Sequence, residues 1–261
     1  MRFVGSVVIA IAMTVSGGCG NKKAEPAAAP ATSSPQWVSF DDEEEEEEDD
    51  LMMVELMKAT AECGNLKKLE PSAMMGKLKD GEVRCLDDTL KDSDRQTFKD
   101  KISRVLMADA WAKGDYHRWE AVVRRHLLEV DRSDPNLCYK FALHLSKANA
   151  EKSDETMKWV DVALENRSHW SGDLYKRRVN SLRKMKALSA TKKWTWIEGR
   201  LLETPTEELR SDARLARNEA KTYAREWLEY AKQAGKDYTQ ALQLCISAAG
   251  TDGFCSGVLD D

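Results

Sequence analysis

Cysteines carry the most distinctive reactive chemistry of this 261-residue chain, which has six of them. Cys63 and Cys85 bracket a Gly-punctuated stretch, and Cys245 and Cys255 flank a turn near the C-terminus. Thiols pair in an oxidising compartment, and a Cys63–Cys85 bond would close a loop of about 22 residues and contribute about 3 kcal/mol. We expect both pairs to form disulfides; the alternative is that each cysteine is an unpaired small apolar residue. Cys138 lies in an apolar helical pattern and is expected to stay a buried thiol.

The sequence contains no pattern typical of a catalytic or metal centre. No two cysteines stand at CxxC spacing, and the HExxH, GxSxG, P-loop and GxGxxG motifs are absent. His126 and His144 fall within apolar stripes, where histidines are more often packed than ligating. A lytic glycosidase on a helical scaffold would need a partly buried Glu in a cleft, and no Glu stands out. We therefore expect no enzyme activity, no cofactor and no metal site.

The most unusual local composition lies in residues 173–200, which carry a net charge of +7 with aromatic residues interleaved. Arginine and tryptophan often anchor interfaces, so this basic stripe is the expected partner-binding site. Three interpretations are open: a solvated face whose aromatic residues point to the core, a site for an acidic partner, anionic lipid or polymer, and a surface covered by the chain's own acidic run. The candidate residues are Arg177, Arg178, Arg183, Lys184, Lys186, Lys192, Lys193, Trp194 and Trp196.

Residues 1–18 have the organisation of an export signal, with a positive start and an apolar run at residues 3–15. That run spans about 20 Å as a helix, which is too short for a bilayer core of about 30 Å. The sequence SGGC at residues 16–19 resembles the lipobox of bacterial lipoproteins, with Ser where Leu is usual. The resemblance implies lipidation of Cys19, and Gly20 after it implies the outer membrane, facing the periplasm. The alternative is ordinary signal-peptide cleavage with Cys19 an incidental thiol.

A tether is expected between this signal and the globular part. Residues 20–40 are rich in Ala, Pro, Ser and Thr, and residues 41–50 read DDEEEEEEDD and contribute −10. These 31 residues would span roughly 30 Å. From residue 51 onward, 37 bases stand against 34 acids, so the globular part is mildly basic. We expect membrane attachment through the lipid anchor and no nucleic-acid partner, because exported proteins rarely meet nucleic acid.

From residue 51 onward, apolar residues recur at helical spacing and no convincing strand pattern occurs. Ile102, Val105, Leu106 and Trp111 form one such stripe. Thr204 is the expected N-cap of a long helix that ends near residue 232, and a last helix is expected at about residues 238–248. The fold class is therefore all-α. Helix breaks are expected at Gly114, Asp134-Pro135, Ser153, Ser171-Gly172, residues 189–191 and Gly235.

The breaks are spaced like those of helix pairs. GDY at residues 114–116, followed by Ala121 and by LLEVD at residues 127–131, resembles the turn and second helix of a tetratricopeptide repeat. Two extra residues separate Gly114 from Ala121, and the Gly of the family's first helix is absent. The resemblance covers about residues 100–250 and implies a TPR-like α-solenoid of helix–turn–helix repeats. The alternative is a generic antiparallel helical bundle.

Four segments are predicted: a lipoprotein signal peptide (1–18), the lipidated cysteine with linker and acidic run (19–50), an N-terminal helical cap with a disulfide (51–100), and a TPR-like repeat domain (101–261). The expected function is that of a membrane-tethered helical-repeat adaptor, which binds unidentified proteins of the bacterial cell envelope. The alternative is an envelope enzyme, or a sensor that binds a cell-wall fragment in a helical cleft.

Overall fold

The computed structural model describes residues 54, 56–58, 60–64, 66–250 and 253–258. The chain divides after Glu46, and every described residue belongs to the unit Glu47–Asp261. The predicted signal peptide, Cys19, linker and acidic run lie outside the described residues. All regular elements in the described ranges are helices, which confirms the all-α prediction.

The α-helices are α2 (Leu66–Met74), α3 (Asp80–Asp92), α4 (Gln96–Ala112), α5 (Tyr116–Glu129), α6 (Pro135–Leu145), α7 (Ser153–Glu165), α8 (Gly172–Glu203), α9 (Glu207–Gln233) and α10 (Thr239–Ala249). Three short 3-10 helices are η1 (Ala150–Lys152), η2 (Arg167–His169) and η3 (Ser256–Val258). Within these ranges, no helix combines the length and the apolar character that crossing a bilayer requires.

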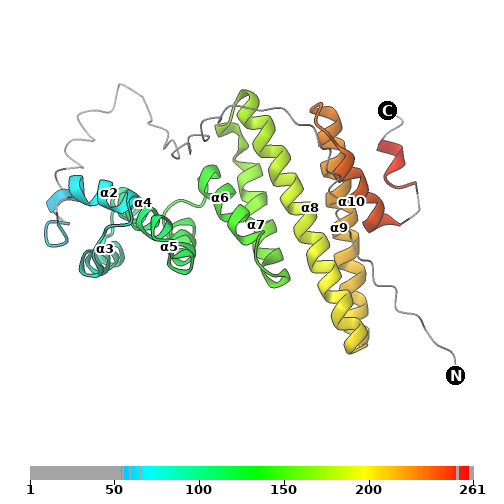
Figure 1. The fold of residues 1–261 in the computed structure, drawn as a ribbon, viewed down its shortest axis with the longest axis horizontal. Helices are drawn as coiled ribbons and strands as arrows, with labels where there is room; N and C mark the ends of the chain where they lie inside the picture. The colour runs from blue at the N-terminus through cyan, green and yellow to red at the C-terminus, as the bar shows by residue number, and fades with distance from the viewer. Residues whose placement is uncertain (1–53, 55, 59, 65, 251–252, 259–261) are drawn as a thin grey trace, which may run out of the picture. The chain divides into compact units, whose positions relative to one another are not determined.

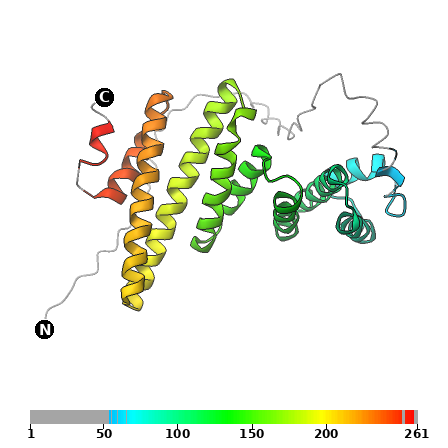
Figure 2. The ribbon, with the colours of Figure 1, turned by 180° about the vertical axis from the view of Figure 1, so that it is seen from behind.

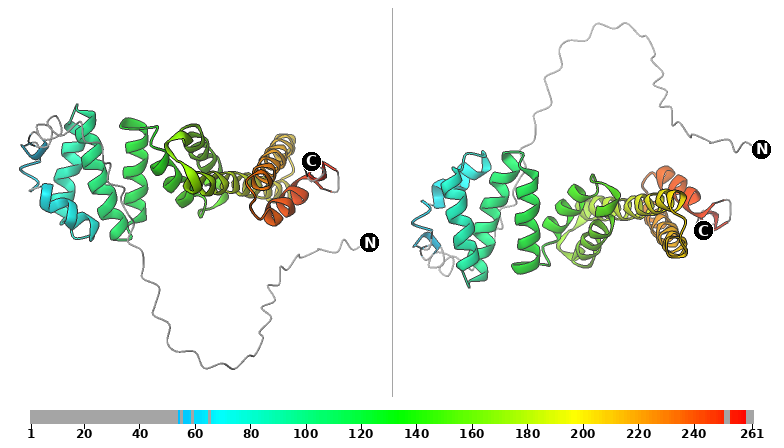
Figure 3. Two further views of the ribbon diagram at one scale, coloured as in Figure 1. Left: turned by 90° about the horizontal axis from the view of Figure 1, so that it is seen from above. Right: turned by 90° about the horizontal axis from the view of Figure 1, so that it is seen from below.

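Most helices that follow one another in the sequence also pack against one another. α4 contacts α2, α3 and α5, and α8 contacts α6, α7, α9 and α10. α8 and α9 lie side by side over much of their length, with α7 on the other side of α8 (Figures 1 and 2). Views from above and below show the helices succeeding one another in chain order (Figure 3).

Most of the predicted helix breaks are confirmed, and each has a local cause. Gly114 and Gly235 adopt positive φ angles of 70° and 63°, which end α4 and α9 in a conformation that favours glycine. Asp134 caps α6 by accepting hydrogen bonds from the main-chain N–H groups of Asn136 and Leu137 at 2.8 and 2.9 Å.

The break predicted at residues 189–191 is wrong, because α8 runs through it from Gly172 to Glu203. The hydroxyl of Thr191 donates to the Ala187 carbonyl at 2.9 Å, so this side chain is accommodated inside the helix. Ala190 is fully buried and packs in one cluster with Ala213 and Ala216 of α9. Small side chains here allow α8 and α9 to approach closely, and that contact sustains the helix.

The predicted N-cap of α9 is also wrong, by two residues. Thr204 is the C-cap of α8, and Thr206 caps α9 by accepting a hydrogen bond from the main-chain N–H of Leu209 at 3.1 Å.

The burial expected for an aromatic residue near the end of α4 is wrong as well. Trp111, expected on the apolar stripe, is 50% exposed and contacts the edges of Tyr116 and Trp119.

The buried apolar residues form three clusters, and α8 takes part in all of them. The first extends from Leu56 to Met185, so it spans both sides of the boundary expected at residue 100, which itself falls within α4. Ala187 belongs to the second cluster and Ala190 to the third, together with residues of α9 and α10. α8 is thus the element through which the packing of the two ends is connected.

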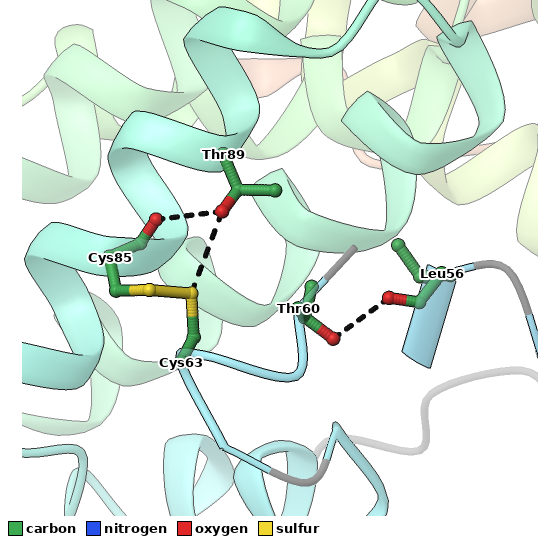
Figure 4. The surroundings of a disulfide bond; sticks show 5 residues. All are labelled: Leu56, Thr60, Cys63, Cys85 and Thr89. Carbon is green, nitrogen blue, oxygen red and sulfur yellow. Dashed lines mark hydrogen bonds between the residues drawn. A yellow bond between two sulfur atoms is a disulfide. The ribbon is translucent and has the colours of Figure 1, made fainter. Parts of the chain in front are cut away.

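Both predicted cysteine pairs lie at disulfide distance, with S–S separations of 1.99 Å for Cys63–Cys85 and 2.06 Å for Cys245–Cys255. The Thr89 hydroxyl donates to the Cys85 carbonyl at 2.9 Å and lies 3.5 Å from the Cys63 sulfur (Figure 4). One bond attaches the segment before α2 to α3, and the other attaches the C-terminal residues to α10.

The third expected cysteine environment is confirmed as well. Cys138 is fully buried and unpaired on α6. Burial raises the pKa of its thiol to about 12, so it stays protonated at neutral pH.

Candidate interaction surface

The predicted basic stripe belongs to a helix that is packed on several sides. Buried residues of α8 include Val179, Leu182, Met185 and Trp194, and the helix contacts α6, α7, α9 and α10. Its bases therefore point to different neighbours, and they do not form one solvated face.

Two lysines of the stripe connect α8 to both of its flanking helices. Lys186 donates to the Asp161 carboxylate of α7 at 2.5 Å and lies over the Tyr223 ring of α9 at 4.1 Å. Lys193 pairs with Asp154 of α7 at 2.7 Å and, more loosely, with a carboxylate of α9 at 3.4 Å. These side chains hold α7, α8 and α9 together.

The three remaining bases in the middle of α8 are also engaged. Lys192 donates to the main-chain carbonyls of Ser146 and Ala148, each at 2.9 Å, which satisfies groups just beyond the end of α6. Arg183 lies 3.6 Å from a carboxylate of α9. Lys184 donates to the side-chain oxygen of a glutamine of α10 at 2.8 Å. From Arg183 to Lys193, the stripe therefore acts within the fold.

The two tryptophans of the stripe have different environments. Trp194 is 9% exposed and packs in the cluster between α8 and α9, with the Arg217 guanidinium over its ring at 5.4 Å. Trp196 is 39% exposed, and the Arg200 guanidinium lies 5.0 Å from its ring centroid. Only Trp196 is accessible to a partner.

Arg178 lies in a surface built from two elements. Its guanidinium stands over the rings of Tyr139 and Trp170, at 5.2 and 5.1 Å, and donates to the side-chain oxygen of Asn136. The indole N–H of Trp170 donates to the same oxygen at 2.9 Å. The surface that we call the Arg178 surface comprises Asn136, Tyr139, Lys140, Trp170, Arg177 and Arg178.

Positive charges on this surface face each other. Burial and the adjacent Arg177 lower the pKa of Arg178, while burial and Arg178 lower the pKa of Lys140. Asp134 acts in the opposite direction on both groups. Within the part of the chain that the structure describes, Arg178 is paired with a neutral amide and two rings and not with a carboxylate. A guanidinium without a carboxylate partner can form charge-assisted hydrogen bonds with an anion.

A serine, a histidine and an aspartate also meet, but inside the core. The Ser103 hydroxyl lies 2.7 Å from Nδ1 of His126, whose Nε2 lies 3.7 Å from a carboxylate oxygen of Asp100. Ser103 and His126 are 1% and 0% exposed, and the serine hydroxyl donates to the Asp100 main-chain carbonyl at 2.9 Å. No substrate can reach this serine, so the cluster links α4 to α5, and the expectation that His126 is packed is confirmed.

His144, the other histidine of that prediction, is partly buried at the end of α6. Its ring contacts those of Tyr116 and Trp119, with centroids 5.9 and 5.0 Å away. Its Nε2 lies 3.5 Å from a Glu120 carboxylate oxygen. Among the described residues, no group of three or more His, Cys, Asp or Glu side chains is placed to hold a metal ion.

Sequence reasoning missed part of the Arg178 surface: Asn136, Tyr139, Lys140 and Trp170 precede the stripe and carry no motif. Tyr139 and Asn136 reach Arg178 only because α6 packs against α8. The half-exposed pair Trp111 and Tyr116 was also missed, since the helical period assigns Trp111 to the core.

Comparisons with known proteins add no family to this description. The chain matches no protein-family model, and neither curated proteins nor solved structures gave a significant match. The regular elements of the described residues are all helices, and several bases of α8 bind groups of the neighbouring helices. A second feature is the cationic Arg178 surface between α6 and α8, in which two aromatic rings lie against the guanidinium.

Proposed function

We propose that this protein is a membrane-tethered helical-repeat adaptor that binds other proteins of the bacterial cell envelope. The observation that supports a repeat most strongly is the spacing of its helix pairs. α4, α6 and α8 begin at Gln96, Pro135 and Gly172, 39 and 37 residues apart, and each is followed by a helix that packs against it. This recurrence is typical of TPR-like α-solenoids, whose stacked pairs offer extended binding surfaces.

The tether belongs to the same proposal. The signal-like residues 1–18 and the lipobox-like SGGC at residues 16–19 support a lipid anchor at Cys19 and attachment to the outer membrane on its periplasmic side. Two cysteine pairs at disulfide distance support an oxidising compartment.

The test is affinity purification of the full-length protein from its native host in mild detergent. A variant with Lys176→Glu and Arg177→Glu is run in parallel, because both side chains are exposed on α8 and their replacement should not disturb the fold. Lys236→Glu, at an exposed position outside the stripe, is the matched control. We expect a stoichiometric protein partner that the double variant loses and the control retains. A preparation that contains no partner protein would contradict the adaptor function.

A sensor that binds a cell-wall fragment is the second candidate, and one observation favours it. Trp111 and Tyr116 are each 50% exposed and contact each other at 5.4 Å, above the buried Trp119 and beside His144. Clustered exposed aromatic side chains mark binding sites more often than scattered ones do. Titration with soluble cell-wall fragments should then change tryptophan fluorescence, and Trp111→Ala should abolish the change. An unchanged signal in the native protein would exclude this candidate.

A further inference from the structure

We infer that the Arg178 surface binds carboxylate side chains of an acidic segment in a partner protein. The inference deepens the proposed adaptor function and rests on it, because it assigns one chemistry to one part of the predicted stripe. It starts from the guanidinium of Arg178, whose central carbon lies 5.2 and 5.1 Å from the ring centroids of Tyr139 and Trp170.

The Arg178 guanidinium has further N–H groups besides the one that donates to Asn136. A guanidinium carries several N–H groups in a rigid fork that matches a carboxylate in a bidentate manner. The hydrogen bond to Asn136 uses Nη1. Among the described arginines, Arg118 and Arg183 have a buried side-chain nitrogen without a partner and Arg178 does not, so the remaining donors of Arg178 reach solvent. A pre-oriented fork loses little conformational entropy when an anion binds.

The charge of the surface selects the ligand. Arg177 is exposed beside Arg178, so two adjacent cations of α8 are presented to a ligand. The Asp134 carboxylate acts on both Arg178 and Lys140 and offsets part of their positive charge. The fork of Arg178 matches the two oxygens of a carboxylate, and the exposed Arg177 beside it fits a segment that carries more than one carboxylate.

The rest of α8 offers no equivalent site. Lys186 and Lys193 already pair with carboxylates of α7, and Lys192 is used by main-chain carbonyls. An acidic segment would have to displace these internal partners, whereas at Arg178 it would add an interaction to a guanidinium that holds only a neutral acceptor. Of the nine residues predicted from the sequence, Arg177 and Arg178 are therefore the ones that we assign to partner binding.

The experiment titrates full-length protein in detergent with a short synthetic peptide of alternating Glu and Ser, and with the same peptide carrying Gln for Glu. We expect binding of the Glu peptide only, weakened by salt. Arg178→Lys keeps the charge but removes the fork, and should weaken binding about tenfold. Arg177→Gln, an exposed change that leaves the packing intact, should weaken it several-fold, and Lys236→Gln, at an exposed position outside the stripe, should leave it unchanged.

Two results would overturn the inference: equal binding of the Glu and Gln peptides, or native affinity in both Arg178→Lys and Arg177→Gln. Binding of inorganic phosphate in preference to the Glu peptide would overturn the choice of carboxylate. The proposed function fails separately. A partner that is recovered from the host and is insensitive to both substitutions refutes this inference and leaves the adaptor intact. Peptide binding that depends on Arg178 in a protein that recovers no partner refutes the adaptor.

Discussion

Buried polar side chains in this protein act as links between elements. Asp109 is fully buried at the end of α4, accepts a hydrogen bond from the main-chain N–H of Leu78 at 3.1 Å and pairs with Lys113 at 3.0 Å and with Arg118. A buried charge is tolerated only when it is paired, so these contacts fix the segment before α3 against the turn between α4 and α5. The carboxylate serves the fold and leaves nothing for a ligand.

The buried His126 leads to a prediction about how stability depends on pH. Burial and the nearby Arg104 lower the pKa of its side chain. The unfolded chain then binds a proton at a higher pH than the folded chain does. Stability falls as the pH drops below about 6.5, and the loss is complete once the pH is below the folded pKa. We expect the urea midpoint to fall between about pH 7 and pH 5, and His126→Gln to flatten this dependence. Urea unfolding at a series of pH values measures it.

The exposed His117 provides the control for this experiment. His117→Gln should keep the native pH dependence. The charged groups that act on His126 are Asp100 and Arg104 of α4, with Asp131 and Asp134 of the turn between α5 and α6. The pKa of Asp131 is lowered, so it titrates at more acid pH. Equal pH slopes in the native protein and in His126→Gln would show that the histidine is not the group responsible.

Residue-scale features were predictable from the sequence when neighbours along the chain determine them. The cysteine pairs and the burial of Cys138 follow from spacing and from an apolar pattern within one helix. The environment of Arg178 does not, because Asn136 and Tyr139 are separated from it by an intervening helix, α7. The sequence identifies a charged residue. Only the tertiary contacts distinguish a base such as Lys193, which pairs with a carboxylate of another helix, from an exposed base such as Arg177.

At the scale of elements, helix breaks were predictable where the residue has one conformational preference. Gly114 and Gly235 favour positive φ, and Asp134 before Pro135 caps a helix, so those positions were correct. Ser and Thr are ambiguous, because their hydroxyls either cap a helix or bond back to a carbonyl inside it. Thr206 does the first and Thr191 does the second. The outcome depends on packing, which the local sequence does not contain.

The contact between α8 and α9 provides the prediction at this scale. Ala187 is fully buried and packs in a cluster with Ala224 and Trp227, so a larger side chain there would push the two helices apart. We expect Ala187→Leu to lower the free energy of unfolding by about 1–3 kcal/mol. Leu188 is 37% exposed, and Leu188→Ala is the matched control, with an expected loss below about 1 kcal/mol. Chemical denaturation measures both, and an equal loss would show that α8 and α9 are not closely packed here.

At the scale of the whole described unit, the two disulfides lie near its two ends. α3 packs mainly on α4 and α10 mainly on α9, whereas α8 contacts helices on several sides. In a repeat array, stability is approximately a sum of nearest-neighbour terms, so terminal elements are the weakest and need extra stabilisation. Cys63–Cys85 fastens α3 to the segment before α2, and Cys245–Cys255 fastens α10 to the C-terminal residues.

This arrangement predicts independent fraying of the two ends, which amide hydrogen exchange can measure. A Cys63→Ser, Cys85→Ser variant should lose about 3 kcal/mol locally, equivalent to exchange roughly 100-fold faster in α3, while α8 stays as protected as in the native protein. A Cys245→Ser, Cys255→Ser variant should show the same effect in α10 alone. If either variant instead accelerates exchange at the opposite end, the helices unfold as one cooperative block, and the nearest-neighbour behaviour on which the repeat proposal depends is refuted.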